Sequence, residues 1–141
     1  MTPSNNEATD DYEDLVSQLN VHGVEFIVVG AYAVGYHGYI RGTGDLDILV
    51  KPTPENAVKV SAAVKAFASV EVDPAEIKAK TRIIVGREPN KVDIMTSIKG
   101  ISWDQAWNSR VPGQMGKQPA SFLSRECLLE NKRAVGRDKG N

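Results

Sequence analysis

The stretch that decides the fold runs from residue 26 to residue 50 and reads FIVVGAYAVGYHGYIRGTGDLDILV. Two apolar runs, at 24–29 and 46–50, have the length and composition of buried strands. Gly30 follows the first run directly. A glycine between a strand and a helix lets the backbone approach a phosphate, and the helix N-terminus behind it offers free N–H groups. We therefore expect a turn at Gly30 and a short helix at about 31–36.

The second strand opens on two acids, Asp45 and Asp47. Residues i and i+2 of a strand point to the same side, so both carboxylates face one side of the sheet and repel each other unless a positive charge lies between them. Asp93 adds a third acid, because the alternating run at 91–95 predicts a half-buried strand that can lie beside 46–50. Three carboxylates at one sheet edge can hold two magnesium ions with help from substrate phosphates. A solvated strand end is the alternative interpretation of an isolated Asp-x-Asp pair.

Each acid of this predicted metal site has an expected role. Asp45 and Asp47 hold both ions, and Asp93 either completes the ion that lowers the pKa of an acceptor hydroxyl or acts as its general base. Arg41 and Thr43 lie just before the acids and are candidates for binding the oxygens of a triphosphate. A solvated loop arginine is an equally good interpretation of Arg41.

The order Gly30-Ala31, Asp45-Leu46-Asp47, Asp93 resembles the signature of the DNA-polymerase-beta-like nucleotidyltransferase superfamily. More narrowly, three segments resemble small bacterial nucleotidyltransferases that are related to the toxin half of AbiE-type (type IV) toxin–antitoxin systems. These segments are VVGAYAVGYHGYIRGTGDLDILV, KVDIMTSIKGISWDQAW and CLLENKRAVGRDK. The resemblance covers about residues 12–139.

The resemblance implies an α+β protein with the nucleotidyltransferase fold, a small mixed β-sheet flanked by helices. It implies that, with Mg²⁺ as cofactor, a nucleoside monophosphate moves from a nucleoside triphosphate to an acceptor hydroxyl and pyrophosphate is released. The acceptor stays open between a tRNA 3′ end, a protein and a small molecule. By the same resemblance, Gly30 and Ala31 bind nucleotide phosphates through the backbone, and Lys132 on the last helix helps to bind them.

A second hypothesis is a catalytically weak binding module that keeps this fold and acts through a protein partner or a homodimer. Two differences motivate it: relatives usually carry Gly or Ser where this chain has Ala31, and they continue beyond residues 136–139 into another acidic helix. Trp103 and Trp107 lie at i and i+4 on one helical face and predict packing in the core or at an interface. Magnesium-dependent binding of a triphosphate would separate the enzyme from the module.

Composition restricts the class of protein. The chain has 141 residues and a formal net charge of -1, which predicts one domain over 12–141 behind a disordered lead at 1–11 and does not favour a long nucleic-acid-binding surface. The single cysteine, Cys127, rules out an intrachain disulfide and is expected in the core of the last helix. No apolar run is long enough to span a bilayer. We expect a cytoplasmic protein without membrane contact.

The remaining elements follow from caps and breakers. A first helix starts at Asp10 or Asp11 and ends at His22-Gly23. The other expectations are a helix at 54–68 capped by Thr53 with Val58, Ala62, Val64 and Phe67 buried, strands at 70–72 and 82–85, helices at 74–80 and 102–107, a loop or weak edge strand at 111–119, and a last helix from Ser124 to Val135 that Gly136 ends.

Overall fold

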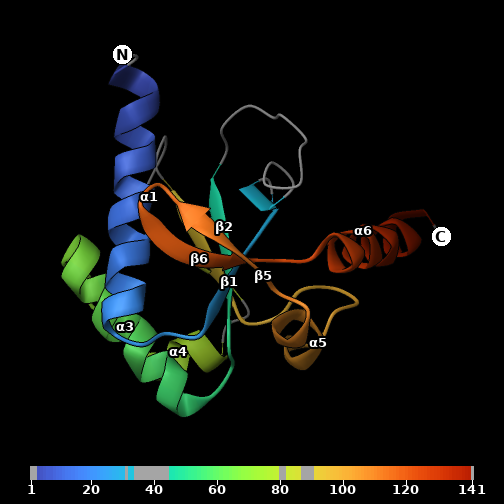
Figure 1. The fold of residues 1–141 in the computed structure, drawn as a ribbon. Coiled ribbons are helices and arrows are strands. Elements are labelled where there is room, and N and C mark those ends of the chain that lie inside the picture. The colour runs from blue at the N-terminus through green and yellow to red at the C-terminus, as the bar shows by residue number, and fades with distance from the viewer. Residues whose placement is uncertain (1–2, 31, 34–44, 80–81, 87–90, 141) are drawn as a thin grey trace.

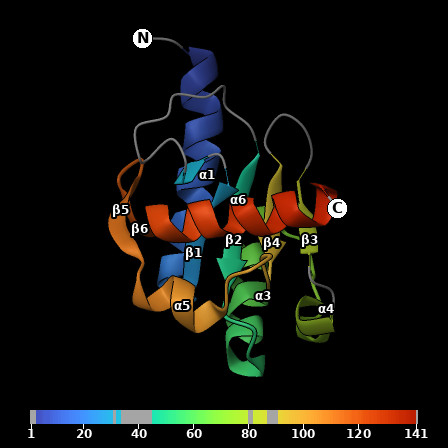
Figure 2. The same cartoon turned by 90° about the vertical axis from the view of Figure 1, so that its right-hand side faces the viewer.

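The computed structural model describes residues 3–30, 32–33, 45–79, 82–86 and 91–140. In chain order its elements are α1 (Pro3–Val21), β1 (Phe26–Val29), β2 (Leu46–Val50), α3 (Pro54–Ala68), α4 (Pro74–Ala79), β3 (Arg82–Val85), β4 (Val92–Met95), α5 (Trp103–Asn108), β5 (Val111–Met115), β6 (Gln118–Phe122) and α6 (Arg125–Gly140). The strands form one six-stranded sheet in the order β3-β4-β2-β1-β6-β5. Helices α1 and α3 lie on one side of the sheet and α5 and α6 on the other (Figures 1 and 2). The predicted α+β architecture is confirmed.

The sheet is mixed, and its central strands are the most buried. Strand β1 is antiparallel to β2 and parallel to β6, and β2 is parallel to β4. Every residue of β1 is buried, as are four of the five residues of β2. Strands that are covered on both faces usually have continuous apolar sequences. The apolar run at 46–50 therefore predicts β2 with the bounds that the structure shows.

Helix α1 begins earlier than the sequence predicts. It starts at Pro3, a residue that suits the first turn of a helix, rather than at Asp10 or Asp11, so residues 3–11 of the expected lead are helical. The first buried side chain described in α1 is that of Tyr12, and the domain boundary at residue 12 stays a prediction. The predicted end is confirmed, because Gly23 has a φ of 70° and allows a left-handed cap.

Helix α3 has the predicted bounds and the predicted cap. The Asn56 backbone N–H donates to Thr53 Oγ1 over 3.2 Å. The predicted buried face is wrong in part: Val64 is buried, but Val58 is 57% exposed and Ala62 is exposed as well. The buried positions are Asn56, Ala57, Val60, Ala63 and Val64. A helix this rich in alanine and valine offers several similar apolar stripes, and packing against α1 selects one of them.

Of three later expectations, one is confirmed in part and two are wrong. The expected loop or weak edge strand at 111–119 is confirmed for β5, which is the edge strand of the sheet, where a proline is tolerated. Its partner β6 was not expected; the two strands form a hairpin that turns at Gly116, where φ is 63°. Residues 70–72 lie outside the strands. Gly136 does not end α6, which continues to Gly140, because a glycine inside a helix costs only about 1 kcal/mol.

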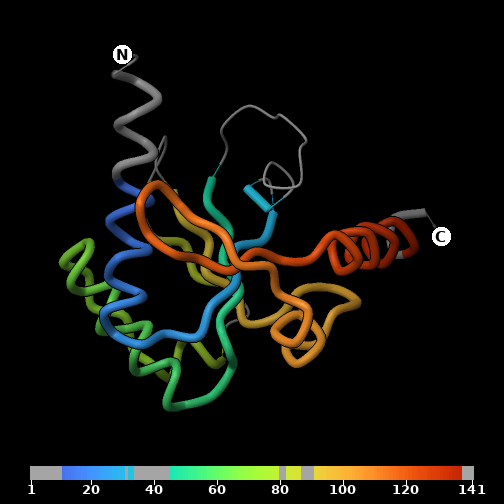
Figure 3. The backbone as a smooth tube through the Cα atoms, in the orientation of Figure 1, coloured from blue at the N-terminus to red at the C-terminus, as the bar shows by residue number. Residues whose placement is uncertain are grey.

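Helices α5 and α6 follow the expected packing. Cys127 is buried, and its N–H donates to the Ser124 Oγ cap over 3.1 Å. Trp103 and Trp107 are stacked with ring centroids 5.2 Å apart and pack against the core, so core packing is their role within this chain. The chain runs from β6 directly into α6, which lies on the side of the sheet opposite α1 and α3 (Figures 2 and 3). None of the described helices is long and apolar enough to cross a membrane.

Asn56 holds α3 to the sheet at the end opposite the acids. Its side chain is buried, donates to the Glu25 and Lys51 carbonyls over 3.0 and 3.1 Å, and accepts from the Glu25 N–H over 2.9 Å. We expect Asn56→Ala to lower the free energy of unfolding by about 2–4 kcal/mol, because three hydrogen bonds are lost and buried backbone groups lose their partner. Urea denaturation measures this loss. The control Asn108→Ala, at an exposed position, should change it little; equal losses would contradict the assigned role.

Candidate functional site

The sheet register places Asp47 beside Asp93. Strands β2 and β4 are parallel, and Asp47 lies opposite Asp93 in their register. The same row of the sheet continues to Val29 on β1 and to Ile84 on β3. Directly paired residues point to one face, so two carboxylates lie side by side between apolar neighbours. The structure thus confirms that these two predicted site residues, 46 positions apart in the sequence, lie together.

Gly30 makes room for the Asp47 carboxylate. It follows β1 with a φ of 70°, a conformation that glycine adopts readily. A Cβ atom at this position would lie 2.2 Å from Asp47 Oδ2 and 3.0 Å from Asp47 Cβ. Tyr32 and Ala33, which follow Gly30, have helical backbone, as expected for a turn from strand to helix. The predicted role of Gly30 in approaching a phosphate is thereby joined by a second role, contact with an acid of the site.

Asp93 is a buried carboxylate with only one oxygen paired. Its side chain is 6% exposed, and Oδ2 accepts from Arg82 Nη2 over 2.5 Å. Oδ1 is buried and has no hydrogen-bond partner among the described residues. Leaving a charged oxygen buried without a partner is costly, so this atom is where an additional cation would gain most.

The Asp47 carboxyl group has a strongly shifted pKa. Burial is the largest cause that raises the pKa of Asp47 to about 6 from its usual 3.8, followed by the neighbouring carboxylate of Asp93. Arg82 lowers this pKa and Asp45 raises it, both by less. The acid pair therefore carries more negative charge than the surrounding cations compensate, which is the condition that favours binding of a metal ion.

Asp45 lies next to the acid pair and is held by a different cation. Its Oδ2 is 3.2 Å from Lys91 Nζ, and both side chains are about one-quarter exposed. Among the described residues, no three Asp, Glu, His or Cys side chains are close enough to surround one metal ion. The structure therefore shows a pair, Asp47 and Asp93, with Asp45 beside it, and participation of Asp45 in a metal site stays a prediction.

The other predicted site residues are only partly placed. Ala31, Arg41 and Thr43 lie outside the described residues. Lys132 is exposed on α6, which crosses the sheet on the side opposite α1 (Figure 2), and no contact with the acids is described for it. Its predicted role in binding phosphate stays a prediction.

Two cations that are not among the predicted site residues, Arg82 and Lys91, pair with acids of the site. Lys91 lies two residues before Asp93, and the predicted pairing of 46–50 with 91–95 would place it opposite Asp45. The pairing of Lys91 with Asp45 could therefore have been predicted from the sequence. Arg82 could not be found in this way, because its contact with Asp93 depends on the register between β3 and β4, in which Arg82 opposes Met95.

The residues present fit a divalent cation. Carboxylate oxygens are the ligands that Mg²⁺ prefers, and the acid pair supplies them from two rigid neighbouring strands. A cation beside the two side chains would give Asp93 Oδ1, which has no partner among the described residues, a positive neighbour, and it would lower the pKa of Asp47. Asp47 and Asp93 are therefore the residues that would hold the ion.

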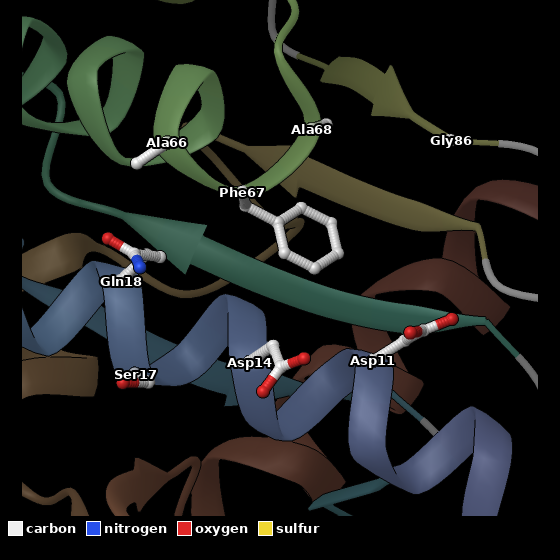
Figure 4. Close-up of a pocket in the computed structure, with 8 residues that line it drawn as sticks. All are labelled: Asp11, Asp14, Ser17, Gln18, Ala66, Phe67, Ala68 and Gly86. Atoms are coloured by element: carbon white, nitrogen blue, oxygen red, sulfur yellow. The ribbon is translucent and has the colours of Figure 1, made fainter.

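A separate pocket of about 500 Å³ lies between α1, the C-terminal end of α3 and Gly86 (Figure 4). Asp11 and Asp14 line it from α1, and the ring of Phe67 points into it from α3. None of the predicted site residues that the structure describes lines this pocket. We therefore locate the candidate site at the acid pair and not in this pocket.

The raised pKa of Asp47 predicts how stability depends on pH without metal. The folded pKa of about 6 exceeds the unfolded value of about 3.9, so the folded state binds this proton more tightly. The contribution of Asp47 is fully present below about pH 4 and is lost as pH rises through about 6. The pKa shift corresponds to a pH-dependent change of at most about 3 kcal/mol in the free energy of unfolding. Because Asp47 is partly exposed, we expect a change of about 2 kcal/mol.

Urea unfolding from pH 4 to 7.5 without divalent cations tests this dependence. Relative to the wild type, Asp47→Asn should gain stability as pH rises through 6, because it cannot acquire the charge. A difference between the two proteins that stays constant across this range would contradict the assignment.

Comparison with known proteins supports the fold. A scan against protein-family models finds no match, and a search of curated proteins finds none either. Among solved structures, a "putative nucleotidyltransferase" (TM1012) from Thermotoga maritima matches with a TM-score of 0.68 and 18% sequence identity, over 99% of this chain and 89% of that chain. At this identity the match shows the fold: the chain has the nucleotidyltransferase fold that the sequence predicts.

Proposed function

We propose that this protein is a magnesium-dependent nucleotidyltransferase that moves a nucleoside monophosphate from a nucleoside triphosphate to an acceptor hydroxyl. The observation that carries the proposal is the acid pair, in which Asp47 and Asp93 lie side by side and a buried oxygen of Asp93 has no partner within the part of the chain that the structure describes. The fold shared with the "putative nucleotidyltransferase" TM1012 supports it.

The chain supplies the groups that this reaction needs. When bound, Mg²⁺ neutralises phosphate charge and lowers the pKa of the acceptor hydroxyl. Asp47 and Asp93 would hold the ion, and Asp45 would be a further ligand if its carboxylate were not paired with Lys91. Asp93 Oδ1, which has no other described partner, is the atom that accepts the hydroxyl proton if it is not a ligand. The backbone after Gly30 binds the phosphates.

The acceptor classes in this proposal are an RNA end, a protein hydroxyl and a small molecule, and a role as the toxin of a toxin–antitoxin pair is one setting for them. The test supplies each α-labelled nucleoside triphosphate in turn, with Mg²⁺ and with the RNA, protein and small-molecule fractions of a bacterial extract. Label should appear in one fraction with the wild type and be absent with Asp93→Asn. No transfer to any fraction, or to the protein itself, would contradict the proposal.

A binding module is the second candidate, and one observation favours it. Both Asp45 and Asp93 are paired with cations of the chain itself, Lys91 and Arg82. A structural group of acids is neutralised in this way without any metal. A module would form a stable complex with a protein partner or a second copy and would show no magnesium-dependent binding of triphosphates.

A further inference from the structure

Arg82 and Asp93 form an ion pair in which only the anion is buried. Strand β3 is antiparallel to β4, with Ile84 opposite Asp93 and Arg82 opposite Met95. Arg82 therefore reaches Asp93 diagonally, from two positions along the strand. Its side chain is 56% exposed, whereas that of Asp93 is 6% exposed. Because the Arg82 guanidinium is already largely in contact with solvent, it can leave Asp93 at little cost in free energy. The buried Asp93 carboxylate stays in place when it does.

One arginine does not satisfy the acid pair. Arg82 bonds Oδ2 of Asp93 and leaves Oδ1 without a described partner. Among the described residues, Asp47 makes no ion pair, because Arg82 pairs with Asp93 and Lys91 pairs with Asp45. A divalent cation carries twice the charge of a guanidinium and, between the two side chains, contacts both carboxylates. It would therefore outcompete Arg82 once its concentration is high enough.

We propose that Arg82 occupies the place of the cation at Asp93 in the metal-free protein and is displaced when a divalent cation binds. Arg82 then sets the metal affinity: it lowers the repulsion between the acids without metal and competes with the ion for Asp93 Oδ2. This inference rests on the proposed function, because it requires that Asp47 and Asp93 bind a metal ion.

Binding of Mn²⁺ in the absence of nucleotide tests the inference, with unbound Mn²⁺ measured by electron paramagnetic resonance. Arg82→Gln keeps a polar side chain but removes the charge, and it should bind Mn²⁺ roughly tenfold more tightly, because a charge-assisted bond no longer competes. Its melting temperature should be lower than that of the wild type without metal and should rise more when Mn²⁺ is added.

Lys51→Gln is the matched control. Lys51 also pairs with a carboxylate, that of Glu25, over 3.6 Å, but it lies four residues beyond Asp47, about 13 Å along the strand. Its loss should leave Mn²⁺ affinity unchanged within about twofold, as expected for a screened charge. An equal tightening in Lys51→Gln would mean that net charge alone sets the affinity, and it would overturn the inference.

Arg82→Lys keeps the charge but loses the planar geometry, so it should show an intermediate affinity and provides a test if Arg82→Gln does not fold. If the Arg82 variants bind Mn²⁺ no more tightly than the wild type and Asp93→Asn abolishes binding, the inference about Arg82 is wrong but the proposed metal site stands. If the wild type and Asp93→Asn bind Mn²⁺ equally, or if neither binds it, both the inference and the proposed metal site are wrong.

Discussion

Replacing Asp47 with asparagine should lower nucleotide transfer by at least about 100-fold while the fold becomes more stable at neutral pH. Asparagine has the size of aspartate but lacks the charge, so the ion loses one anionic ligand. A bound metal supplies several kcal/mol of charge stabilisation, and each 1.36 kcal/mol is tenfold in rate. Stability should rise because Asp47, with its pKa raised to about 6, is held charged beside Asp93 at pH 7.5.

Opposite changes in activity and stability distinguish a functional acid from a structural one. The control Asp104→Asn, at an exposed position in the first turn of α5, should leave both quantities nearly unchanged. The measurements are transfer of label from the α-phosphate and urea unfolding at pH 7.5. An Asp47→Asn variant that retains more than a tenth of the activity, or that loses activity and stability together, would contradict this role.

Replacing Gly30 with alanine should abolish transfer and lower the free energy of unfolding by about 2–4 kcal/mol. The new Cβ would lie 2.2 Å from Asp47 Oδ2, so either the carboxylate or the turn must move. The left-handed backbone, with a φ of 70°, adds about 1–2 kcal/mol for any residue with a side chain. Both consequences displace the acid on which the proposed metal site depends.

Gly23 provides the matched control, because its φ is also 70° but an added Cβ would meet no atom within 4 Å. Gly23→Ala should therefore lose only the backbone contribution, about 1–2 kcal/mol, and should keep its activity. The difference between the two variants isolates the contact with Asp47. Equal losses of stability, or a Gly30→Ala variant that remains active, would show that this contact does not matter.

Local signals in the sequence were enough for much of the fold. Thr53 and Pro54 together specify the start of α3, and the apolar run 46–50 specifies β2, because a cap and a buried strand depend mainly on neighbouring residues. The meeting of Asp47 and Asp93 was predicted from alternation on two strands. The bounds of these elements and the contact between the two acids agree with the structure.

Features that depend on distant contacts were not accessible in the same way. The pairing of Arg82 with Asp93 requires the register of two strands, and the buried face of α3 is chosen by α1, since its alanines and valines allow several stripes. The strand β6 was missed because Pro119 and two glycines suggest a loop, although hydrogen bonding with β5 and the position beside β1 form a strand there.

The central claim is that the acid pair forms a site for a nucleoside triphosphate and magnesium. Isothermal titration calorimetry with non-hydrolysable analogues of the four nucleoside triphosphates tests it directly, with circular dichroism to confirm that Asp93→Asn is folded. We predict that at least one analogue binds to the wild type with Mg²⁺, that binding is lost when EDTA replaces Mg²⁺, and that it is lost in Asp93→Asn. Absence of binding by all four, or binding that persists in EDTA and in Asp93→Asn, would contradict the claim.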